Sequence, residues 1–309
     1  MQSAIALLQK YSVAGPRYTS YPTAPYFHTG FGEADWAETL AAPAPDRGLS
    51  LYAHIPFCDS LCYYCGCNMV ATQDYSKTQP YLATLDQEMA RTAQLVDTHR
   101  AVRQLHWGGG TPTYLNPDDI RRLMAMMRSR FTLADDAEVS CEVDPRELTR
   151  AHLVALRESG FNRLSFGVQD MDPAVQQAVN RIQSEALIQQ VLDWSRELGF
   201  SSINLDLIVG LPKQTVASFS RTLERVTEWA PDRLAVFAYA HVPWLKKHQN
   251  LIQQADLPDL ATRLGLQQTV NETLGAAGYV NIGLDHFARP EDELVRAQQN
   301  KTLWRNFQG

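Results

Sequence analysis

Four of the chain's five cysteines lie within one ten-residue window, as Cys58, Cys62, Cys65 and Cys67. Thiolates packed this closely in a short loop typically hold a soft metal ion or an iron–sulfur cluster. The first three have the spacing C-x3-C-x2-C, and the simplest interpretation uses these three as the ligands. Three thiolates on a four-iron cluster would leave one iron without a protein ligand, which is typical of a site that binds a substrate or cofactor. Cys67 follows Cys65 so closely that both are awkward to place in one compact site, so we predict that Cys67 is not a ligand.

Two other interpretations of these cysteines remain open. Structural zinc sites usually pair two cysteine knuckles that lie about 12–20 residues apart. The chain has no second knuckle, because its remaining cysteine is Cys141, and no His-x3-His pair lies near the loop. Unligated or redox-active cysteines are the third interpretation. We expect Cys141 to be a small core residue.

Strands and helical patterns alternate along the chain from Ser50 onwards, which is the pattern of βα units around a parallel sheet. The predicted strands are Leu51–Phe57, Val102–Gly108, Glu138–Val143, Arg163–Val168, Ile203–Val209 and Arg233–Tyr239. The predicted helices are Tyr81–Val96, Pro117–Arg130, Thr149–Ser159, Glu185–Leu198, Ser218–Trp229 and Leu260–Leu274, with Asn116 and Asp118 as capping candidates for the second. Six βα units predict an α/β fold, a partial (βα)6 barrel rather than a closed eightfold one.

Chemistry in such barrels takes place at the C-terminal ends of the strands. The cysteine loop follows the first predicted strand. The later strands end at Gly108–Thr111, at Glu142 and Asp144, at Gln169 and Asp170, at Asp206 and Gly210, and at Tyr239–His241. These residues are therefore predicted to gather at one rim with the cysteines, although strand ends are also polar wherever they meet water.

The composition is ordinary for a globular protein: 309 residues, 45% hydrophobic and 20% charged. A net charge of −6 without long Lys/Arg clusters argues against general nucleic-acid binding. No stretch approaches the roughly 18 apolar residues of a membrane helix, and the N-terminus lacks the basic segment of a secretory signal. A cytosol keeps thiols reduced, so we expect a cytoplasmic protein. The Ala- and Pro-rich segment 41–45 is expected to separate an N-terminal arm, residues 1–48, from a barrel domain, residues 49–309.

The cysteine motif and its surroundings resemble the radical S-adenosylmethionine (radical SAM) superfamily. The strand Leu51–Phe57 leads directly into C-x3-C-x2-C, and an aromatic residue, Tyr64, precedes the third cysteine. Downstream, the run Gln104–Thr113 resembles the superfamily's glycine-rich strand end. The resemblance implies a TIM-like partial (βα)6 barrel, a [4Fe-4S] cluster held by the first three cysteines, and SAM as a second cofactor.

Further motifs resemble one family within it, the oxygen-independent coproporphyrinogen III dehydrogenases. These motifs are the extra cysteine Cys67, the arm Gly15–Ala24, and the runs His106–Leu115, Glu142–Arg146, Asn162–Asp170, Asp206–Pro212 and Asp285–Pro290. The resemblance extends over nearly the whole chain, from about Leu8 to Gly309. A related haem chaperone family shares the cysteine triad but lacks the extra cysteine and the arm. A haem-binding protein is therefore the second-ranked alternative.

The resemblance implies an oxidoreductase of porphyrin and haem biosynthesis. The family oxidatively decarboxylates two propionates of coproporphyrinogen III to vinyls, which gives protoporphyrinogen IX, and a SAM-derived 5′-deoxyadenosyl radical removes the hydrogen. Two bound SAM molecules and an electron donor for the cluster are also implied. We expect a monomer without a nucleic-acid partner.

The resemblance also matches ten positions to the family's SAM contacts, without apportioning them between two SAM molecules. These are Tyr52, Tyr64, Gly109, Gly110, Thr111, Glu142, Gln169, Arg181, Asp206 and Ala240. The glycines would let the backbone approach methionine, and a tight turn is their alternative role. Tyr64 would pack on adenine or face the core, and the two carboxylates suit ribose hydroxyls or the SAM ammonium. Gln169 and Arg181 would donate hydrogen bonds, Ala240 would contribute its backbone, and His54 and His106 are expected to be core histidines or to line the site.

Four substrate carboxylates facing an acidic protein need local cations, for which Arg17, Arg289 and Arg305 are the candidates. Aromatic residues of the arm would cover a tetrapyrrole face, although a solvated or core-packed arm is equally open; they are Tyr18, Tyr21, Tyr26 and Phe27. Family members continue beyond residue 309 into a helical C-terminal domain. The resemblance therefore implies that this domain is absent and that the chain could be an inactive fragment.

Overall fold

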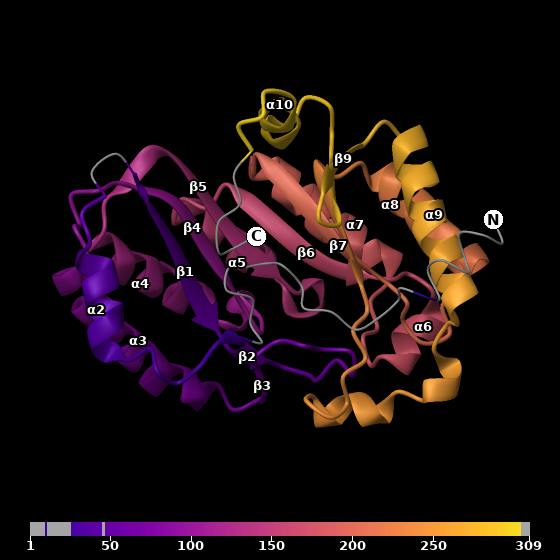
Figure 1. The fold of residues 1–309 in the computed structure, drawn as a ribbon, viewed down its shortest axis with the longest axis horizontal. Coiled ribbons are helices and arrows are strands. Elements are labelled where there is room, and N and C mark those ends of the chain that lie inside the picture. The colour runs from indigo at the N-terminus through magenta and orange to yellow at the C-terminus, as the bar shows by residue number, and fades with distance from the viewer. Residues whose placement is uncertain (1–9, 11–25, 45–46, 304–309) are drawn as a thin grey trace.

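An eight-stranded, mostly parallel sheet runs through the centre of the computed structural model, which describes residues 10, 26–44 and 47–303 (Figure 1). Its strand order is β1-β4-β5-β6-β7-β8-β10-β9. The first six strands of that order are parallel and are β1 (Leu49–Ile55), β4 (Val102–Gly109), β5 (Leu133–Val143), β6 (Arg163–Gln169), β7 (Ser202–Val209) and β8 (Arg233–Ala238). These are the six predicted strands; most ends differ by one or two residues, but β5 begins five residues before the predicted Glu138.

Helices follow the strands and lie along the outer face of the sheet (Figure 1). They are α3 (Thr78–Leu95), α4 (Pro117–Arg128), α5 (Arg150–Glu158), α6 (Pro173–Ala178), α7 (Glu185–Glu197), α8 (Val216–Trp229) and α9 (Leu260–Ala276). All except α6 correspond to predicted helices, and α4 shows why these form where predicted. The Asn116 side chain accepts from the Asp119 backbone N–H at 2.8 Å, Pro117 occupies the first turn, and Ile120, Leu123 and Met127 are buried.

The strands separate apolar and polar side chains onto opposite faces. In β4, Leu105 and Trp107 are fully buried, and Trp107 meets the Phe161 ring edge-on at 4.8 Å between centroids. Successive side chains in a strand point to opposite faces, so His106 lies on the other face of the same strand. The same alternation in β5 buries Cys141 in the core, as predicted, and leaves Glu142 on the polar face. The helix-covered face therefore forms the core, and the opposite face carries the polar lining.

Several short elements were not predicted. The two-stranded sheet of β2 (Phe57–Cys58) and β3 (Val70–Ala71) brackets the cysteine loop. An antiparallel extension, β10 (His286–Ala288) with β9 (Val280–Gly283), follows β8 and precedes α10 (Glu293–Gln299). Helix α2 (Glu33–Ala41) lies within the predicted N-terminal arm and contacts α3.

The sheet is open rather than closed into a full barrel, because β1 and β9 are its two ends. This confirms the predicted partial (βα)6 architecture. No helix in the described ranges combines the length and apolar character needed to cross a bilayer.

Candidate functional site

The cysteine loop begins and ends at one point of the sheet edge. The Val70 N–H donates to the Pro56 carbonyl at 2.7 Å, and the Thr72 N–H donates to the Cys58 carbonyl at 2.9 Å. The loop therefore leaves and rejoins the fold directly after β1, at the C-terminal ends of the parallel strands, where it was predicted to lie.

Each of the three predicted ligand sulfurs contacts a different polar group. Two arginines donate to the buried Cys62 Sγ, Arg146 Nη2 at 3.4 Å and Arg181 Nη1 at 3.5 Å. Cys58 Sγ lies 3.4 Å from Thr111 Oγ1. Cys65 Sγ accepts from the Cys67 backbone N–H at 3.4 Å. Donors around three neighbouring sulfurs are the surroundings that stabilise thiolates and tune iron–sulfur clusters.

The thiol pKa values differ within the loop. Burial raises the pKa of Cys58 to about 11, although the hydrogen bond with Thr111 opposes the shift. The hydrogen bond from the Cys67 side chain lowers the pKa of Cys65 to about 6, since it outweighs burial and is assisted by His248 and Lys246. The pKa of Cys67 is raised, because its thiol donates this hydrogen bond to Cys65. Cys65 is thus prepared for ligation, because a metal-bound cysteine must be deprotonated.

The three predicted ligand cysteines of this loop are free, and they are donors of the kind that an iron–sulfur cluster takes. Within residues 10, 26–44 and 47–303, no group of three His, Cys, Asp or Glu side chains converges so that it could hold one metal ion. The cysteines of a four-iron cluster bind separate iron atoms, so their sulfurs need not converge on one point. The residues present therefore fit the cluster that the spacing suggests.

A buried charge network adjoins Cys62. Asp144 Oδ2 lies 2.6 Å from Arg146 Nη2 and 2.9 Å from Arg181 Nη1, and Arg181 Nη2 also donates to the Gly167 carbonyl at 2.6 Å. Burial alone would raise the pKa of Asp144, but Arg181 and then Arg146 outweigh it and lower the pKa to about 2. Two guanidinium groups share one carboxylate here, which leaves positive charge facing the cysteine sulfur.

The glycine run after β4 packs against the end of β1. A Cβ on Gly110 would lie 2.5 Å from the Pro56 carbonyl oxygen, and one on Gly109, whose φ is +124°, would lie 2.8 Å from the Ile55 carbonyl oxygen. The Gly110 N–H donates to that Ile55 carbonyl at 2.8 Å. Glycine is therefore required at these positions because two strand ends pack closely together there. That the glycines also approach the methionine part of SAM stays a prediction.

Polar residues from β1, β4 and β5 meet on the inner face of the sheet. The Tyr52 ring stacks on His106 at 5.9 Å and its hydroxyl lies 3.0 Å from His54 Nδ1. Glu142 accepts from the Gly109 N–H at 3.2 Å and lies 3.4 Å from His106 Nε2. The two histidines are thus partly buried and lie beside predicted site residues, and their role at the site stays a prediction.

Asp206 lies on the same inner face, in β7. It accepts from Ser165 Oγ at 3.0 Å and from Asn204 Nδ2 at 2.7 Å. Burial, and next the nearby Glu142 carboxylate, raise the pKa of Asp206 to about 6. Two carboxylates that face one space repel each other, so a cationic ligand between them would be stabilised.

Gln169 ends β6 in a left-handed backbone conformation, with φ of 67°. A Cβ on Gly167 would lie 2.7 Å from Gln169 Nε2 and 2.9 Å from Arg181 Nη2, so these two predicted donors lie side by side. The next residue, Asp170, is buried and anchors the turn through Gln214 Nε2 at 2.6 Å and Thr222 Oγ1 at 2.9 Å. A strained conformation held by buried hydrogen bonds is typical of a functional position.

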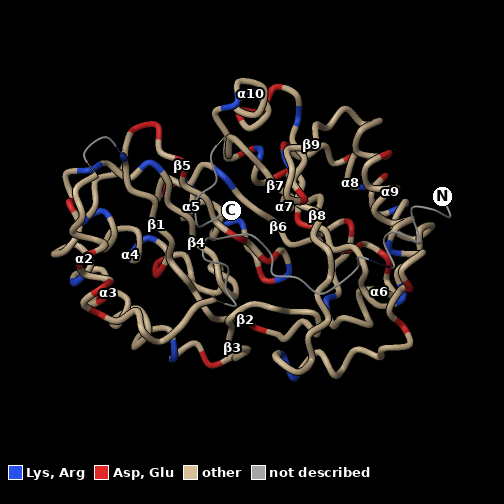
Figure 2. The backbone as a smooth tube through the Cα atoms, in the orientation of Figure 1, with Lys and Arg blue, Asp and Glu red and all other residues tan. Residues whose placement is uncertain are grey.

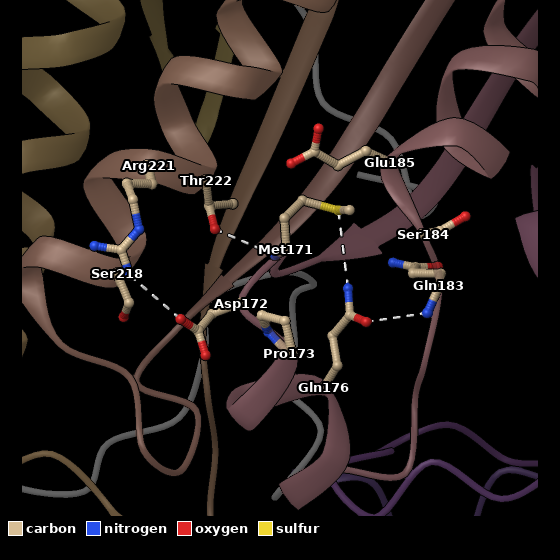
Figure 3. A pocket seen from close by; sticks show the side chains of 10 residues that line it. All are labelled: Met171, Asp172, Pro173, Gln176, Gln183, Ser184, Glu185, Ser218, Arg221 and Thr222. Atoms are coloured by element: carbon tan, nitrogen blue, oxygen red, sulfur yellow. Dashed lines mark hydrogen bonds and ion pairs between the residues drawn. The ribbon is translucent and has the colours of Figure 1, made fainter.

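A cavity of about 350 Å³ lies behind this turn, among α6, α7 and α8 (Figure 3). In Figure 3 the Gln176 side chain reaches the Met171 sulfur and the Gln183 backbone, and Thr222 reaches the Met171 backbone. The side chains that line this cavity thus make hydrogen bonds to the segment that follows Gln169.

Tyr64 and Ala240 complete the predicted set. Tyr64 packs with Ile208 and Tyr239 against Val175, Val179 and Leu211, and burial raises its pKa. Ala240 is exposed, and its carbonyl accepts from Gln249 Nε2 at 3.2 Å. All ten predicted SAM-contacting residues therefore lie in the described structure. Most lie in or just after the C-terminal halves of the strands, whereas Tyr52 lies in the middle of β1, Tyr64 in the cysteine loop and Arg181 after α6.

Arg289, one of the three predicted substrate cations, is not brought to this rim. Arg289 donates to the carbonyls of Pro231 at 3.0 Å and Ala230 at 2.9 Å, which precede β8, at the opposite end of that strand from the cysteine loop. We correct the expectation for Arg289, because its guanidinium caps the end of α8 instead. Arg17, Arg305, Tyr18 and Tyr21 lie outside the described residues, and Tyr26 and Phe27 are exposed.

Charged residues of both signs are interspersed along the described backbone (Figure 2). Several residues that contact the cysteine loop had no role predicted from the sequence. Asp144 and Arg146 stood in a motif that could have suggested one. Asn180 Nδ2 donates to the Leu61 carbonyl at 2.8 Å, and Lys246, His248 and Gln249 reach the loop from a segment without any recognisable motif.

Comparisons with known proteins agree with this geometry. Residues 52–226 match the model of the radical SAM superfamily. The curated oxygen-independent coproporphyrinogen III oxidases of Salmonella typhimurium and Escherichia coli K12 are each 53% identical over 305 residues, covering 99% of this chain and 66% of their own length. The chain thus spans slightly less than two thirds of these relatives.

A solved structure is also similar over nearly the whole chain. Coproporphyrinogen III oxidase (HemN) from Escherichia coli, described as a radical SAM enzyme, matches with a TM-score of 0.92 at 52% identity, covering 98% of this chain and 68% of that one. The chain therefore belongs to the radical SAM superfamily and, within it, to the family of oxygen-independent coproporphyrinogen III oxidases.

Proposed function

We propose that this chain forms the catalytic barrel of an enzyme that oxidatively decarboxylates two propionates of coproporphyrinogen III to vinyls, in haem biosynthesis. The names of the relatives support this substrate, and their reaction is the one implied by the dehydrogenase resemblance. The observation that carries the proposal is the position of the three-cysteine loop. It lies at the C-terminal strand ends, beside the polar inner face that also carries Glu142 and Asp206.

Cys58, Cys62 and Cys65 are the proposed ligands of a [4Fe-4S] cluster. Together with SAM the cluster supplies an oxidant strong enough to remove an unactivated hydrogen, which no side chain could do alone. The chain's own part is to hold and orient. Arg146 and Arg181 offset the negative charge of Cys62, and Cys67 supports Cys65 by hydrogen bonding without being a ligand.

SAM is proposed to bind along the inner strand ends. The Glu142 and Asp206 carboxylates suit its cationic or hydroxyl groups, Gln169 and Arg181 offer adjacent donors, and Tyr64 offers an aromatic face. Tyr52, Gly109, Gly110, Thr111 and Ala240 complete the proposed contacts. Two SAM molecules are proposed from the family resemblance.

The remaining partners are also proposals. An electron donor must reduce the cluster, and a reducing compartment such as the cytoplasm would preserve it. We propose a monomer with an N-terminal arm, residues 1–48, a barrel domain, residues 49–309, and substrate contacts made partly by the arm.

The test is an anaerobic reaction with the 309-residue chain after cluster reconstitution. Coproporphyrinogen III, SAM and a reductant are added, and products are separated by chromatography. The proposal predicts a vinyl product together with methionine and 5′-deoxyadenosine. Stable haem binding without a vinyl product would instead support the alternative, a haem-carrying protein on the same barrel.

A further inference from the structure

The segment between β8 and α9, residues 239–259, is far longer than an ordinary βα connection. Such connections usually have about 2–6 residues, and long ones without much regular structure usually serve a function. This segment contains only two short 3-10 helices, Lys247–Leu251 and Gln254–Asp256. In Figure 1 it appears in orange below the sheet, and the purple cysteine loop extends toward it.

Three side chains of this segment donate to three carbonyls of the cysteine loop. Gln249 Nε2 donates to the Tyr64 carbonyl at 2.9 Å and Lys246 Nζ to the Cys67 carbonyl at 2.8 Å. His248 Nε2 lies 2.7 Å from the Cys65 carbonyl. The contacts join residues about 180 positions apart, from opposite ends of the parallel strand set.

Gln249 is the centre of this arrangement. Its side chain is fully buried, and it donates a second hydrogen bond to the Ala240 carbonyl at 3.2 Å while its Oε1 accepts from the Val242 N–H at 2.6 Å. A buried amide with its groups satisfied fixes the segments it joins, since breaking it leaves buried polar groups without partners. One side chain thus links the segment after β8, including the proposed SAM contact Ala240, with the loop that carries the cysteines.

Two other carbonyls of the loop are also held by side chains from the barrel. Asn180 Nδ2 donates to Leu61 at 2.8 Å, and His54 Nε2 lies 2.7 Å from the Asn68 carbonyl. The half of the loop from Tyr64 to Cys67, however, depends on the segment after β8 for its carbonyl partners. That half carries the third proposed ligand, Cys65.

We propose that Lys246, His248 and Gln249 form a clamp that positions Cys65 for the cluster and couples the cluster loop to the proposed SAM site at Ala240. This inference rests on the proposed function and names positioning residues for it, since none of the three is a proposed ligand. Lys246 also places an ammonium group beside the Cys65–Cys67 turn, and positive charge near a cluster favours its reduced form.

The test compares Gln249→Ala with Asn250→Ala, a neighbour whose Nδ2 donates only to the Lys247 carbonyl at 2.9 Å. Both proteins are reconstituted anaerobically, and three properties are measured: loss of iron to a chelator, the electron paramagnetic resonance spectrum of the reduced cluster, and its change on adding SAM. Melting of the cluster-free proteins reports folding. Gln249→Ala should lose iron about 10-fold faster and show a smaller SAM-induced spectral change, while Asn250→Ala behaves as the unchanged protein.

Three further variants keep the test decisive if Gln249→Ala does not fold. His248→Ala alters a half-buried side chain and should also speed iron loss, and His248→Gln, which keeps a donor, should restore retention. Lys246→Met should lower the reduction potential of the cluster. Unchanged iron loss, spectra and potential in all loaded variants would overturn the clamp. Failure of the unchanged protein to bind any cluster would instead overturn the proposed function.

Discussion

At the scale of single residues, the cysteine loop is defined by what surrounds each sulfur. Cys62 faces two guanidinium groups, whereas Cys65 faces the N–H of Cys67. The two positions should therefore respond differently to substitution. The spacing of the cysteines could be read from the sequence, but their neighbours could not, because Arg146 and Arg181 reach Cys62 only through the fold.

Replacement of Cys62 should abolish cluster binding, whereas replacement of Cys67 should preserve it. Cys62→Ala removes a proposed ligand, and Cys67→Ser keeps the backbone N–H that donates to Cys65 Sγ at 3.4 Å. Iron and sulfide per chain, measured after anaerobic reconstitution, check this. An equal loss in both variants would refute the assignment of three ligands.

Removal of the Asp144 carboxylate should destabilise the cluster-free protein in a pH-dependent way. Its pKa is lowered to about 2, against about 3.9 in an unfolded chain. The carboxylate therefore stabilises the fold above pH 4, and this contribution is lost as the pH falls toward 2. At pH 6 the ionised carboxylate should raise the free energy of unfolding by roughly 2 kcal/mol relative to Asp144→Asn, and at pH 3 by about half of that.

Urea unfolding of the two cluster-free proteins at pH 6 and pH 3 measures this difference. Glu158→Gln is the control, because Glu158 forms an exposed ion pair with Arg121. The Glu158 side chain is 56% exposed. Its effect should stay small at both pH values. A difference for Asp144→Asn that does not change with pH would show that ionisation of this carboxylate does not stabilise the fold.

At the scale of elements, period-two alternation in the strands made the fold predictable. Leu105 and Trp107 in β4, and Val139 and Cys141 in β5, mark the buried face, so the six parallel strands and their helices could be placed from the sequence. The short pairs β2–β3 and β9–β10 could not, because strands of two to four residues carry too little pattern. Their pairing depends on tertiary contacts instead.

The junction of β1 and β4 should not tolerate a side chain at position 110. In Gly110→Ala the new Cβ would meet the Pro56 backbone at 2.5 Å, so backbone must shift. We expect a loss of about 1–3 kcal/mol in the free energy of unfolding. Gly66→Ala is the matched control, because nothing lies within 4 Å of its Cβ. Equal stability of both variants by chemical denaturation would contradict the packing argument.

At the scale of the whole molecule, the sheet extends beyond its parallel strands, and buried ion pairs join the extension to the rest. Arg233 of β8 pairs with Asp292 at 2.9 Å and with Glu293 at 3.1 Å, at the start of α10. Arg163 of β6 also pairs with Glu293. None of these pairings was predicted from the sequence, because residues 59, 60 and 130 positions apart carry no local signal of contact.

Replacement of Arg233 should release α10 from the sheet. Its side chain is 14% exposed and that of Asp292 is 9% exposed, so Arg233→Met leaves a buried carboxylate without its partner. We expect a loss of about 3–5 kcal/mol. Arg103→Met is the control: its pair with Asp136 is 60% and 76% exposed and should contribute at most about 1 kcal/mol. Thermal unfolding of both variants measures the difference, and similar melting temperatures would argue against the buried pair.

The backbone at Gln169 has a practical consequence for anyone who engineers this protein for heat tolerance. A left-handed conformation is cheap only for glycine, so Gln169→Gly should make the fold more robust by roughly 1 kcal/mol. The same change deletes the carboxamide that lies beside Arg181. Selection for thermal stability alone would therefore favour variants that lack the proposed SAM contact of the Gln169 side chain.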